Sequence, residues 1–273
     1  MLDSKRIGLI GAGMMAEAIA RGLIESGIDP SRITAFDPSE ERLAFFSEQL
    51  GVLKASNNTG VIHSADVVIL AVKPYVVSEV LSSIGSEFKS DQLLISIAAG
   101  VTTEFIEKRF EAHIPVIRVM PNTPCLIGKG VSAISSGKYA GEAQMEIAAE
   151  IFGAVGEVVR VTEDKIDAVT GLSGSGPAYV YTFIEALADG GVRMGLPRAT
   201  ALLLAAQTVS GAAEMVIQSA EHPAVLRDRV TTPGGTTIAG TAVLEAEGFR
   251  SAIIKAVTAA AERSAELGKP KNS

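Results

Sequence analysis

The segment RIGLIGAGMMAEAIARGLIE, residues 6–25, decides the fold of the first half of this chain. A short apolar run leads into the pattern G-x-G-x-x-A, and a helical pattern follows. Gly11 permits a tight turn, Gly13 lets the backbone approach a pyrophosphate, and the small Ala16 lets strand and helix pack closely. Free N–H groups at the start of a helix suit a phosphate. The segment therefore predicts a dinucleotide-binding strand, turn and helix.

Short runs rich in β-branched residues alternate with helical patterns up to about Val161. This alternation is typical of βαβ units in a parallel sheet. The predicted strands are 6–10, 32–36, 67–72, 93–97, 116–120, 131–135 and 157–161, and the predicted helices are 14–25, 40–50, 76–84, 103–109 and 141–152. The run 66–72 is apolar on both faces, as in a sheet that helices cover on both sides. We expect a doubly wound (Rossmann) parallel sheet in a dinucleotide-binding domain over residues 1–161.

Beyond Val161 the chain predicts helices only. Helical periodicity covers 166–189, 198–218, 223–229, 238–247 and 249–267. These segments are apolar over more than one face, which favours a subunit interface that covers the surplus surface, with an ordinary helical core as the alternative. We expect an all-helical substrate-binding and dimerisation domain over residues 162–273.

Composition excludes several classes of function. The formal net charge of −7 argues against a nucleic-acid partner, because phosphate binding needs a basic face. The one cysteine, Cys125, forms neither an internal disulfide nor a zinc site by itself, which indicates a reducing compartment. No run of about 18 apolar residues lacks a charge, and His63, His113 and His222 lack metal-ligand spacing. We expect a cytoplasmic protein with no membrane, nucleic-acid or metal partner.

The second predicted strand ends at Asp37, 24 residues after Gly13. A carboxylate at this place accepts hydrogen bonds from the adenosine ribose of NAD and repels the extra phosphate of NADP. The sequence 37–40 also suits a helix N-cap, and both roles are compatible. We expect NADH to be accepted, with NADPH still open because Arg42 lies one turn away.

Two further strand ends, AVKP at 71–74 and IAAG at 97–100, are built for a ligand. In open sheets ligands lie outside the carboxyl ends of the strands, and small residues there leave room for the nicotinamide. For Lys73 a solvated charge is an equal alternative. The predicted cofactor contacts are Ile10, Gly11, Ala12, Gly13, Met14, Met15, Asp37, Ala71, Val72, Lys73, Pro74, Ala98 and Ala99.

Two stretches of the helical half are rich in glycine and hydroxyl side chains. The first, GLSGSGPAY at 171–179, lies inside a helical pattern, where such residues are costly unless close packing or a ligand requires them. The second, TTPGGTT at 231–237, directly precedes a helix and offers N–H groups and hydroxyls suited to a carboxylate. An ordinary loop with a Thr N-cap is the alternative, but two such stretches in one chain favour a substrate site.

With these motifs the sequence resembles the pyrroline-5-carboxylate reductases. The matching segments run through nearly the whole chain in the family's order and are 10–13, 71–74, 98–101, 120–124, 167–179, 194–198, 222–223 and 232–237. The resemblance implies reduction of 1-pyrroline-5-carboxylate to L-proline by NADPH or NADH, and a homodimer joined through the helical domains, with higher assemblies of dimers in some members. It also aligns Asn58 with a contact to the adenosine side of the cofactor.

The resemblance further implies roles for individual residues. Thr237 would place its hydroxyl at the imine nitrogen, and Glu163 matches a position near proline. The residues that would hold the substrate carboxylate are Thr232, Gly234, Gly235 and Thr236. Those that would line the opposite wall of the pocket across the dimer are Ser173, Ser175 and Pro177. Hydride transfer to a C=N bond needs orientation and a hydrogen-bonding group near the nitrogen, and neither a nucleophile nor a metal.

Two other functions are weighed against this one. A β-hydroxyacid dehydrogenase shares the two-part plan, but that family relies on a lysine in the long helix after the first domain, and 166–189 contains none. A non-catalytic dinucleotide-binding protein would use the helices for assembly alone and would bind NAD(P)H without turnover.

Overall fold

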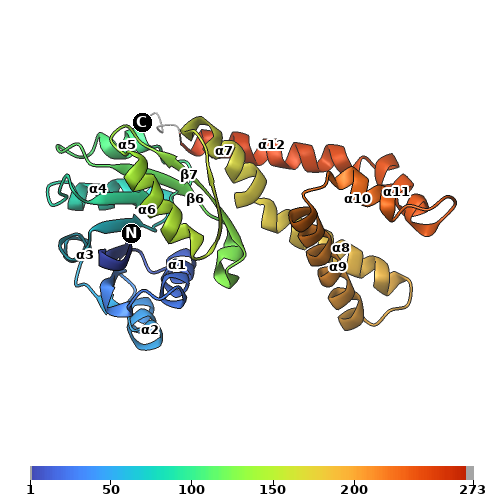
Figure 1. The fold of residues 1–273 in the computed structure, drawn as a ribbon, viewed down its shortest axis with the longest axis horizontal. Helices are drawn as coiled ribbons and strands as arrows, with labels where there is room; N and C mark the ends of the chain where they lie inside the picture. Colours follow the sequence, from blue (N-terminus) through green and yellow to red (C-terminus); the bar gives the residue numbers. More distant parts are fainter. Residues whose placement is uncertain (1, 269–273) are drawn as a thin grey trace. The chain divides into compact units, whose positions relative to one another are not determined.

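The computed structural model describes residues 2–268, which fall into two compact units (Figure 1). The first unit contains the residues up to Ser175 and those from Ala259. The second unit is Gly176–Thr258. The chain therefore passes between the units twice.

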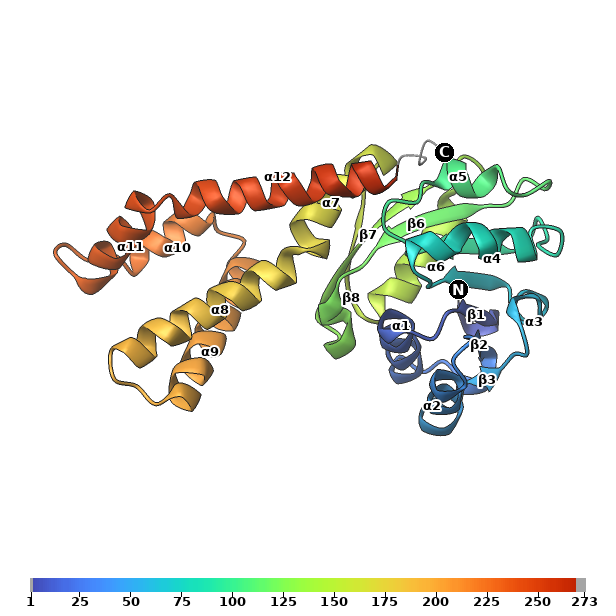
Figure 2. The same ribbon diagram turned by 180° about the vertical axis from the view of Figure 1, so that it is seen from behind.

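An eight-stranded sheet lies at the centre of the first unit (Figures 1 and 2). The strands are β1 (Ile7–Ile10), β2 (Ile33–Phe36), β3 (Leu53–Lys54), β4 (Val67–Leu70), β5 (Leu93–Ser96), β6 (Val116–Met120), β7 (Gly130–Ser136) and β8 (Gly156–Arg160). Their order is β3-β2-β1-β4-β5-β6-β7-β8. The chain reverses direction across the sheet between β1 and β4, as in a doubly wound fold, so the predicted fold class is confirmed.

One pair of strands departs from the expected parallel arrangement. β6 and β7 run antiparallel, whereas the other neighbouring pairs are parallel. A parallel crossover needs a connection of about a dozen residues or more. The link between these strands is shorter and holds only a 3₁₀ turn, Thr123–Ile127, so the chain returns alongside β6 in the opposite direction.

Helices cover both faces of this sheet, as the apolar strands predict. They are α1 (Met14–Glu25), α2 (Glu40–Leu50), α3 (Asn58–Ser64), α4 (Val77–Ile84), α5 (Thr103–Glu107) and α6 (Glu142–Gly153). Alternate residues of β4 enter different clusters: Ile69 belongs to one, Val68 and Leu70 to the other. Neither β3 nor α3 was predicted, because both are short and α3 begins in the polar stretch 56–59.

The predicted helix 166–189 is interrupted in the structure. It consists of α7 (Ile166–Val169), a π-helical turn (Thr170–Gly174) and α8 (Gly176–Arg193). The Ser175 N–H donates to Thr170 O at 2.8 Å. A Cβ on Gly174 would lie 2.6 Å from Met120 Cε, so a side chain there would require the end of Met120 to move. Such turns inside helices are frequent at functional sites.

The second unit holds α8, α9 (Arg198–Ser219), α10 (Pro223–Arg229), α11 (Thr236–Ala246) and the start of α12 (Phe249–Leu267). Its buried apolar core among the described residues is three alanines: Ala188, Ala201 and Ala205. Its exposed large apolar side chains include Leu203, Met215, Ile217, Val243 and Ile254. Apolar surface on this scale marks an interaction face.

α9 has a second property that follows from the same composition. Among residues 2–268 it is the one helix that is long and apolar enough to cross a membrane, judged by length and composition alone. Of its best window, 11% is buried in the structure. We relate its apolar character to the interaction face of the second unit, of which it is a part.

Candidate active site

The glycine turn after β1 joins three strand ends. Gly11 has φ +98°, a left-handed conformation that glycine adopts without strain. Its N–H donates to Phe36 O of β2 at 2.8 Å. A Cβ on Gly11 would lie 2.6 Å from Ala71 O, just beyond β4. The turn therefore requires glycine, both for its φ and for its contact with the neighbouring strand end.

Open space lies over the start of α1. Gly13 is the N-cap residue, and as a glycine it has no side chain to cap the first-turn amides. A Cβ on Gly13 would meet no atom within 4 Å, and Met14 is 65% exposed. First-turn N–H groups have no partner within their own helix. These amides and the open space above Gly13 fit a pyrophosphate.

Asp37 is fastened to this glycine turn. Its Oδ2 accepts the N–H of Ala12 at 2.8 Å, and its Oδ1 accepts the N–H of Ser39 at 2.9 Å. The N-cap of α2 is Ser39, whose hydroxyl accepts the N–H of Arg42 at 3.4 Å. Of the two roles considered for Asp37, the helix cap thus belongs to Ser39. The Asp37 carboxylate lies at the glycine turn.

Arg42 is bound to the same turn. Its Nε donates to Ala12 O at 2.7 Å, and its Nη2 lies 2.8 Å from Glu17 Oε2. The guanidinium lies over the ring of Phe45, 5.0 Å from its centroid. Partial burial raises the pKa of Glu17, but the hydrogen bonds from Arg42 and Arg21 outweigh burial and hold it below its ordinary value. Arg42 is therefore an ion-paired, positioned side chain.

The other predicted cofactor residues lie at the carboxyl ends of β1, β4 and β5, which are neighbours in the sheet. Ala98 is buried, Met15, Ala71, Val72 and Ala99 are half-buried, and Lys73 and Pro74 are exposed. Backbone hydrogen bonds join these ends: Ala71 N–H donates to Ile10 O at 2.8 Å, and Ile97 N–H to Leu70 O at 3.2 Å. The structure thus brings the segments 10–15, 71–74 and 98–99 together at the carboxyl ends of neighbouring strands.

Asn58 lies on α3, a helix absent from the sequence-based expectation. The N-cap of α3 is Asn57, whose Oδ1 accepts the N–H of Gly60 at 2.8 Å. The amide of Asn58 donates to Ser83 Oγ at 3.4 Å. Adjacent asparagines therefore have different contacts.

The stretch 231–237 forms a turn that opens α11. Gly235 N–H donates to Thr232 O at 3.0 Å, and Gly234 between them has φ +66°. Gly235 is the N-cap of α11, and as a glycine it has no side chain to cap the first-turn amides. Thr236 is exposed and Thr237 half-buried. The first-turn N–H groups and two threonine hydroxyls therefore gather at one helix end, in the second unit.

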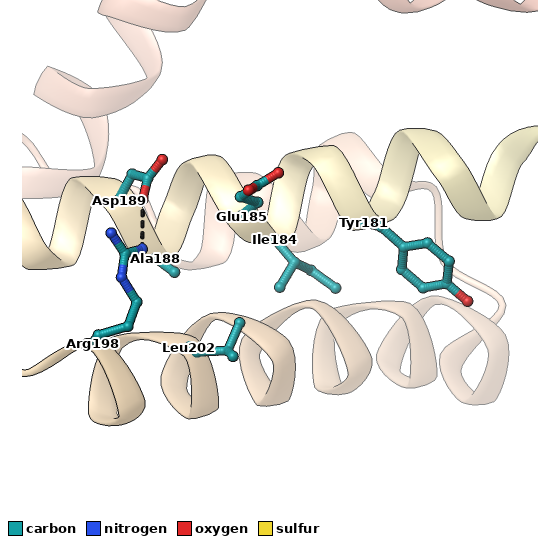
Figure 3. A pocket seen from close by; sticks show the side chains of 7 residues that line it. All are labelled: Tyr181, Ile184, Glu185, Ala188, Asp189, Arg198 and Leu202. Atoms are coloured by element: carbon teal, nitrogen blue, oxygen red, sulfur yellow. Dashed lines mark hydrogen bonds and ion pairs between the residues drawn. The ribbon is translucent and has the colours of Figure 1, made fainter.

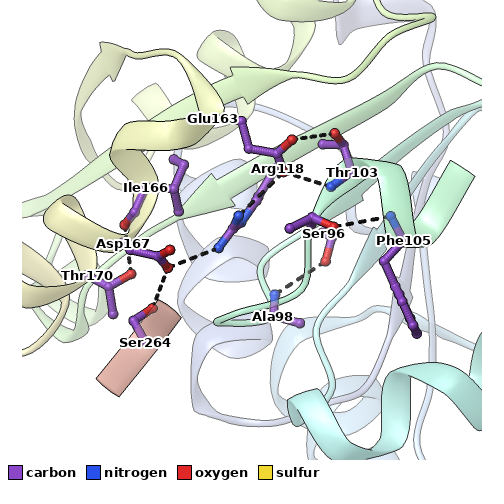
Figure 4. Close-up of polar contacts among 11 residues, drawn as sticks. Ser96, Ala98, Thr103, Phe105, Arg118, Glu163, Ile166, Asp167, Thr170 and Ser264 are labelled. Atoms are coloured by element: carbon purple, nitrogen blue, oxygen red, sulfur yellow. Dashed lines mark hydrogen bonds and ion pairs between the residues drawn. The ribbon is translucent and has the colours of Figure 1, made fainter. Parts of the chain in front are cut away.

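Glu163, Ser173 and Ser175 lie in the first unit. Both carboxylate oxygens of Glu163 are occupied: Oε1 accepts the N–H of Thr103 and Oε2 accepts its hydroxyl, each at 2.7 Å (Figure 4). The Ser173 hydroxyl donates to Val169 O at 3.1 Å. Ser175 is half-buried, as is Pro177 at the start of α8. Glu163 is thus engaged by the protein's own groups.

Sequence reasoning missed the partner of Glu163, Arg118 of β6. Its Nη1 lies 3.4 Å from Glu163 Oε1, and its side chain is 4% exposed. A signal was present, because VIRVM at 116–120 places one charge inside an otherwise apolar strand. A buried charge of this kind needs a partner.

The second unit also contains a cavity of about 530 Å³ between α8 and α9 (Figure 3). Arg198 Nη1 and Asp189 Oδ1 form an ion pair of 2.5 Å at one end. The lining residues are Tyr181, Ile184, Glu185, Ala188, Asp189, Arg198 and Leu202. None of the predicted site residues is among them.

Two family models match different parts of the chain. Residues 163–267 match the family model described as pyrroline-5-carboxylate reductase dimerisation, and residues 6–100 match NADP oxidoreductase coenzyme F420-dependent. The pyrroline-5-carboxylate reductase of Synechocystis sp. is 51% identical over 97% of this chain and 99% of that relative, and the one from Arabidopsis thaliana is 49% identical over 97% and 96%. The solved structure of a pyrroline-5-carboxylate reductase from Coxiella burnetii has a TM-score of 0.90 at 42% identity, covering 98% of this chain and 100% of that one. That of Plasmodium falciparum pyrroline carboxylate reductase with NADP bound has a TM-score of 0.88 at 33% identity, covering 98% and 99%.

The doubly wound sheet, its glycine turn and these matches define an NAD(P)H-dependent oxidoreductase whose second region matches a dimerisation domain. The class does not fix the substrate, because many oxidoreductases share this fold. The full-length relatives do fix the family: the chain belongs to the pyrroline-5-carboxylate reductases.

Proposed function

We propose that this chain reduces the C=N bond of 1-pyrroline-5-carboxylate to give L-proline, the last step of proline biosynthesis. The observation that carries the proposal is the family membership over 97% of the chain. The turn at 231–237 supports it, because uncapped N–H groups at the start of an 11-residue helix suit the carboxylate of a small imino acid.

Individual residues have proposed roles at this turn. The backbone of Gly234, Gly235 and Thr236, with the Thr232 hydroxyl, holds the substrate carboxylate. Thr237 places its hydroxyl at the ring nitrogen, where a hydrogen bond steadies the charge and proton on the C=N group as it is reduced. The nicotinamide, when bound, supplies the hydride.

We propose that the cofactor occupies the edge formed by the ends of β1, β2, β4 and β5. The amides of Gly13, Met14 and Met15 face the pyrophosphate, and Asp37 faces the adenosine ribose. Ala98 and Ala99 face the nicotinamide, with residues 71–74 beside it and Asn58 towards the adenosine. Because Asp37 is a carboxylate and Arg42 is paired with Glu17, we expect NADH to be preferred over NADPH.

We propose a homodimer, in a cytoplasmic protein, with further assembly of dimers open. The exposed apolar side chains of the second unit and the dimerisation match over 163–267 support a second copy as the covering partner. Ser173, Ser175 and Pro177 would then line the pocket from the opposite copy. We also propose that the cofactor-binding domain ends at residue 161 and that the substrate-binding and dimerisation domain begins at residue 162. Glu163 then belongs to the substrate-binding domain.

The test is an absorbance assay of NADH and NADPH oxidation by the purified protein. We expect oxidation only when pyrroline-5-carboxylate is supplied, with proline as the product. Cofactor binding without oxidation would instead favour a non-catalytic dinucleotide-binding protein. Turnover of a β-hydroxyacid with NAD⁺, and none with the imino acid, would favour the dehydrogenase alternative.

A further inference from the structure

A buried polar cluster lies beside the end of β5, in the first unit (Figure 4). At its centre is Arg118, which is paired in the sheet with Ser96, the last residue of β5. Arg118 Nη1 lies 3.4 Å from Glu163 Oε1, and Nη2 lies 3.6 Å from Asp167 Oδ1. Among the described residues Nη2 has no partner at hydrogen-bonding distance. Two carboxylates from the α7 region thus share one buried cation.

The cluster holds the far end of the loop that follows β5. Residues 97–102 form this loop, which we call the β5 loop, and Thr103 begins α5 directly after it. Both oxygens of Glu163 accept hydrogen bonds from Thr103, one from its N–H and one from its hydroxyl. The end of the β5 loop is thereby tied to Arg118 through Glu163.

The cluster also reaches the middle of the β5 loop, through α12. Asp167 Oδ1 accepts the hydroxyl of Ser264 at 2.7 Å. One turn later the chain reaches Gly268, where a Cβ would lie 2.5 Å from Gly100 O. A Cβ on Gly100 would in turn lie 3.2 Å from Gly268 N. Two backbones therefore pack directly on each other, and Asp167 fixes one of them.

Stability alone does not explain a charged group at this position. The desolvation of a buried ion pair offsets much of its attraction, so apolar residues of similar volume are often as stabilising. The neighbours of Arg118 in β6, Ile117 and Val119, are apolar and buried. What the cluster supplies is geometry, because it fastens α5, α7 and α12 to one arginine.

We propose that Arg118 is a positioning residue for the nicotinamide end of the cofactor. By holding Glu163 and Asp167, it keeps Thr103 and Gly268 in place, and these fix the β5 loop in the shape that receives the ring. The inference rests on the proposed contact of Ala98 and Ala99 with the nicotinamide.

The test compares the binding of NADH with that of ADP-ribose, which keeps the pyrophosphate but lacks the nicotinamide. NADH is titrated by its fluorescence, and ADP-ribose by competition. Asp167→Asn and Ser264→Ala each loosen one link and leave Arg118 and Glu163 in place. We expect each to raise the Kd of NADH roughly 2- to 30-fold, with the Kd of ADP-ribose unchanged and with faster hydrogen exchange at the amides of 100–103.

Arg118→Lys keeps the charge but loses the two-pronged geometry, so we expect the same selective loss of NADH affinity. Glu142→Gln is the matched control, because it breaks an exposed ion pair with Arg160 in the same unit. It should change neither affinity. General destabilisation of the fold would weaken both ligands together, and that result would overturn the proposal.

Ala99→Val separates the two ideas, since it alters the β5 loop itself. If Ala99→Val changes the NADH to ADP-ribose ratio and Asp167→Asn and Ser264→Ala do not, the positioning role of Arg118 is wrong and the nicotinamide placement stands. If none of the three changes the ratio, the placement is wrong and the inference falls with it.

Discussion

Replacing Asp37 should change the cofactor that the enzyme prefers, and it should also lower the stability of the fold. The two effects have different causes. The carboxylate accepts N–H groups from Ala12 and Ser39 at 2.8 and 2.9 Å. Hydrogen bonds to a charged group contribute about 1.5–3 kcal/mol each when buried. Asp37 is half-buried, so we expect Asp37→Ser to lower the free energy of unfolding by about 2 kcal/mol in total.

The charge of Asp37 should act on the cofactor separately. Two unit charges 4 Å apart repel by about 1 kcal/mol in water and about 4 kcal/mol near a protein surface. Removing the charge should therefore improve NADPH relative to NADH by about 2 kcal/mol, which is roughly 30-fold in the ratio of kcat/KM. Asp37→Asn keeps the shape and removes the charge, so it should show the same shift, and it should also lose stability because its amide NH2 cannot accept one of the two N–H groups.

The assay is steady-state kinetics with both cofactors, together with urea unfolding of each variant. Asp66→Asn is the matched control, since Asp66 Oδ2 also accepts a backbone N–H, from Arg6 at 2.7 Å, but at the amino-terminal ends of β1 and β4. It should lower stability and leave the cofactor ratio unchanged. A ratio that stays constant in both Asp37 variants would refute the reasoning and leave Asp37 as a support of the glycine turn alone.

Three further outcomes are expected at the substrate turn and at the buried thiol. Thr237→Ala should lower kcat by an amount equal to about 2–4 kcal/mol of activation free energy, with the Kd of NADH unchanged. Thr236→Ala retains the backbone amide and should lower kcat far less. Equal kinetics of the two variants would exclude a role for the Thr237 hydroxyl. Gly235→Ala should raise the KM for the imino acid, because its Cβ would collide with Thr232 Oγ1, and an unchanged KM would count against carboxylate binding there. Burial raises the pKa of the Cys125 thiol, so the folded protein should react slowly with a thiol reagent. The free energy of unfolding should fall as pH rises above the ordinary thiol pKa, because the thiol of the unfolded chain ionises first. Cys125→Ala should remove that part of the fall in urea titrations.

Local sequence patterns predicted the order and type of most elements. The bounds of α1, α2, α10 and α12 agree with the expectation, because each has a clear apolar periodicity and a distinct beginning or end. The periodicity of apolar residues does not indicate the direction of a strand, so it could not predict that β7 runs antiparallel to β6. It also does not reveal the π-helical turn, in which the Ser175 N–H donates to Thr170 O five residues back.

The sequence by itself determined the chemistry that is available: a glycine turn between strand and helix, a carboxylate after the second strand, and a threonine-rich helix start. These are local features, and neighbouring residues suffice to specify them. Only the tertiary structure decided which groups those residues contact. Asp37 meets Ala12, and Arg118 meets Glu163 and Asp167, across 25 to 49 positions of the chain. Such pairs form because the fold brings together segments that are far apart in the chain. A local sequence pattern does not contain that information.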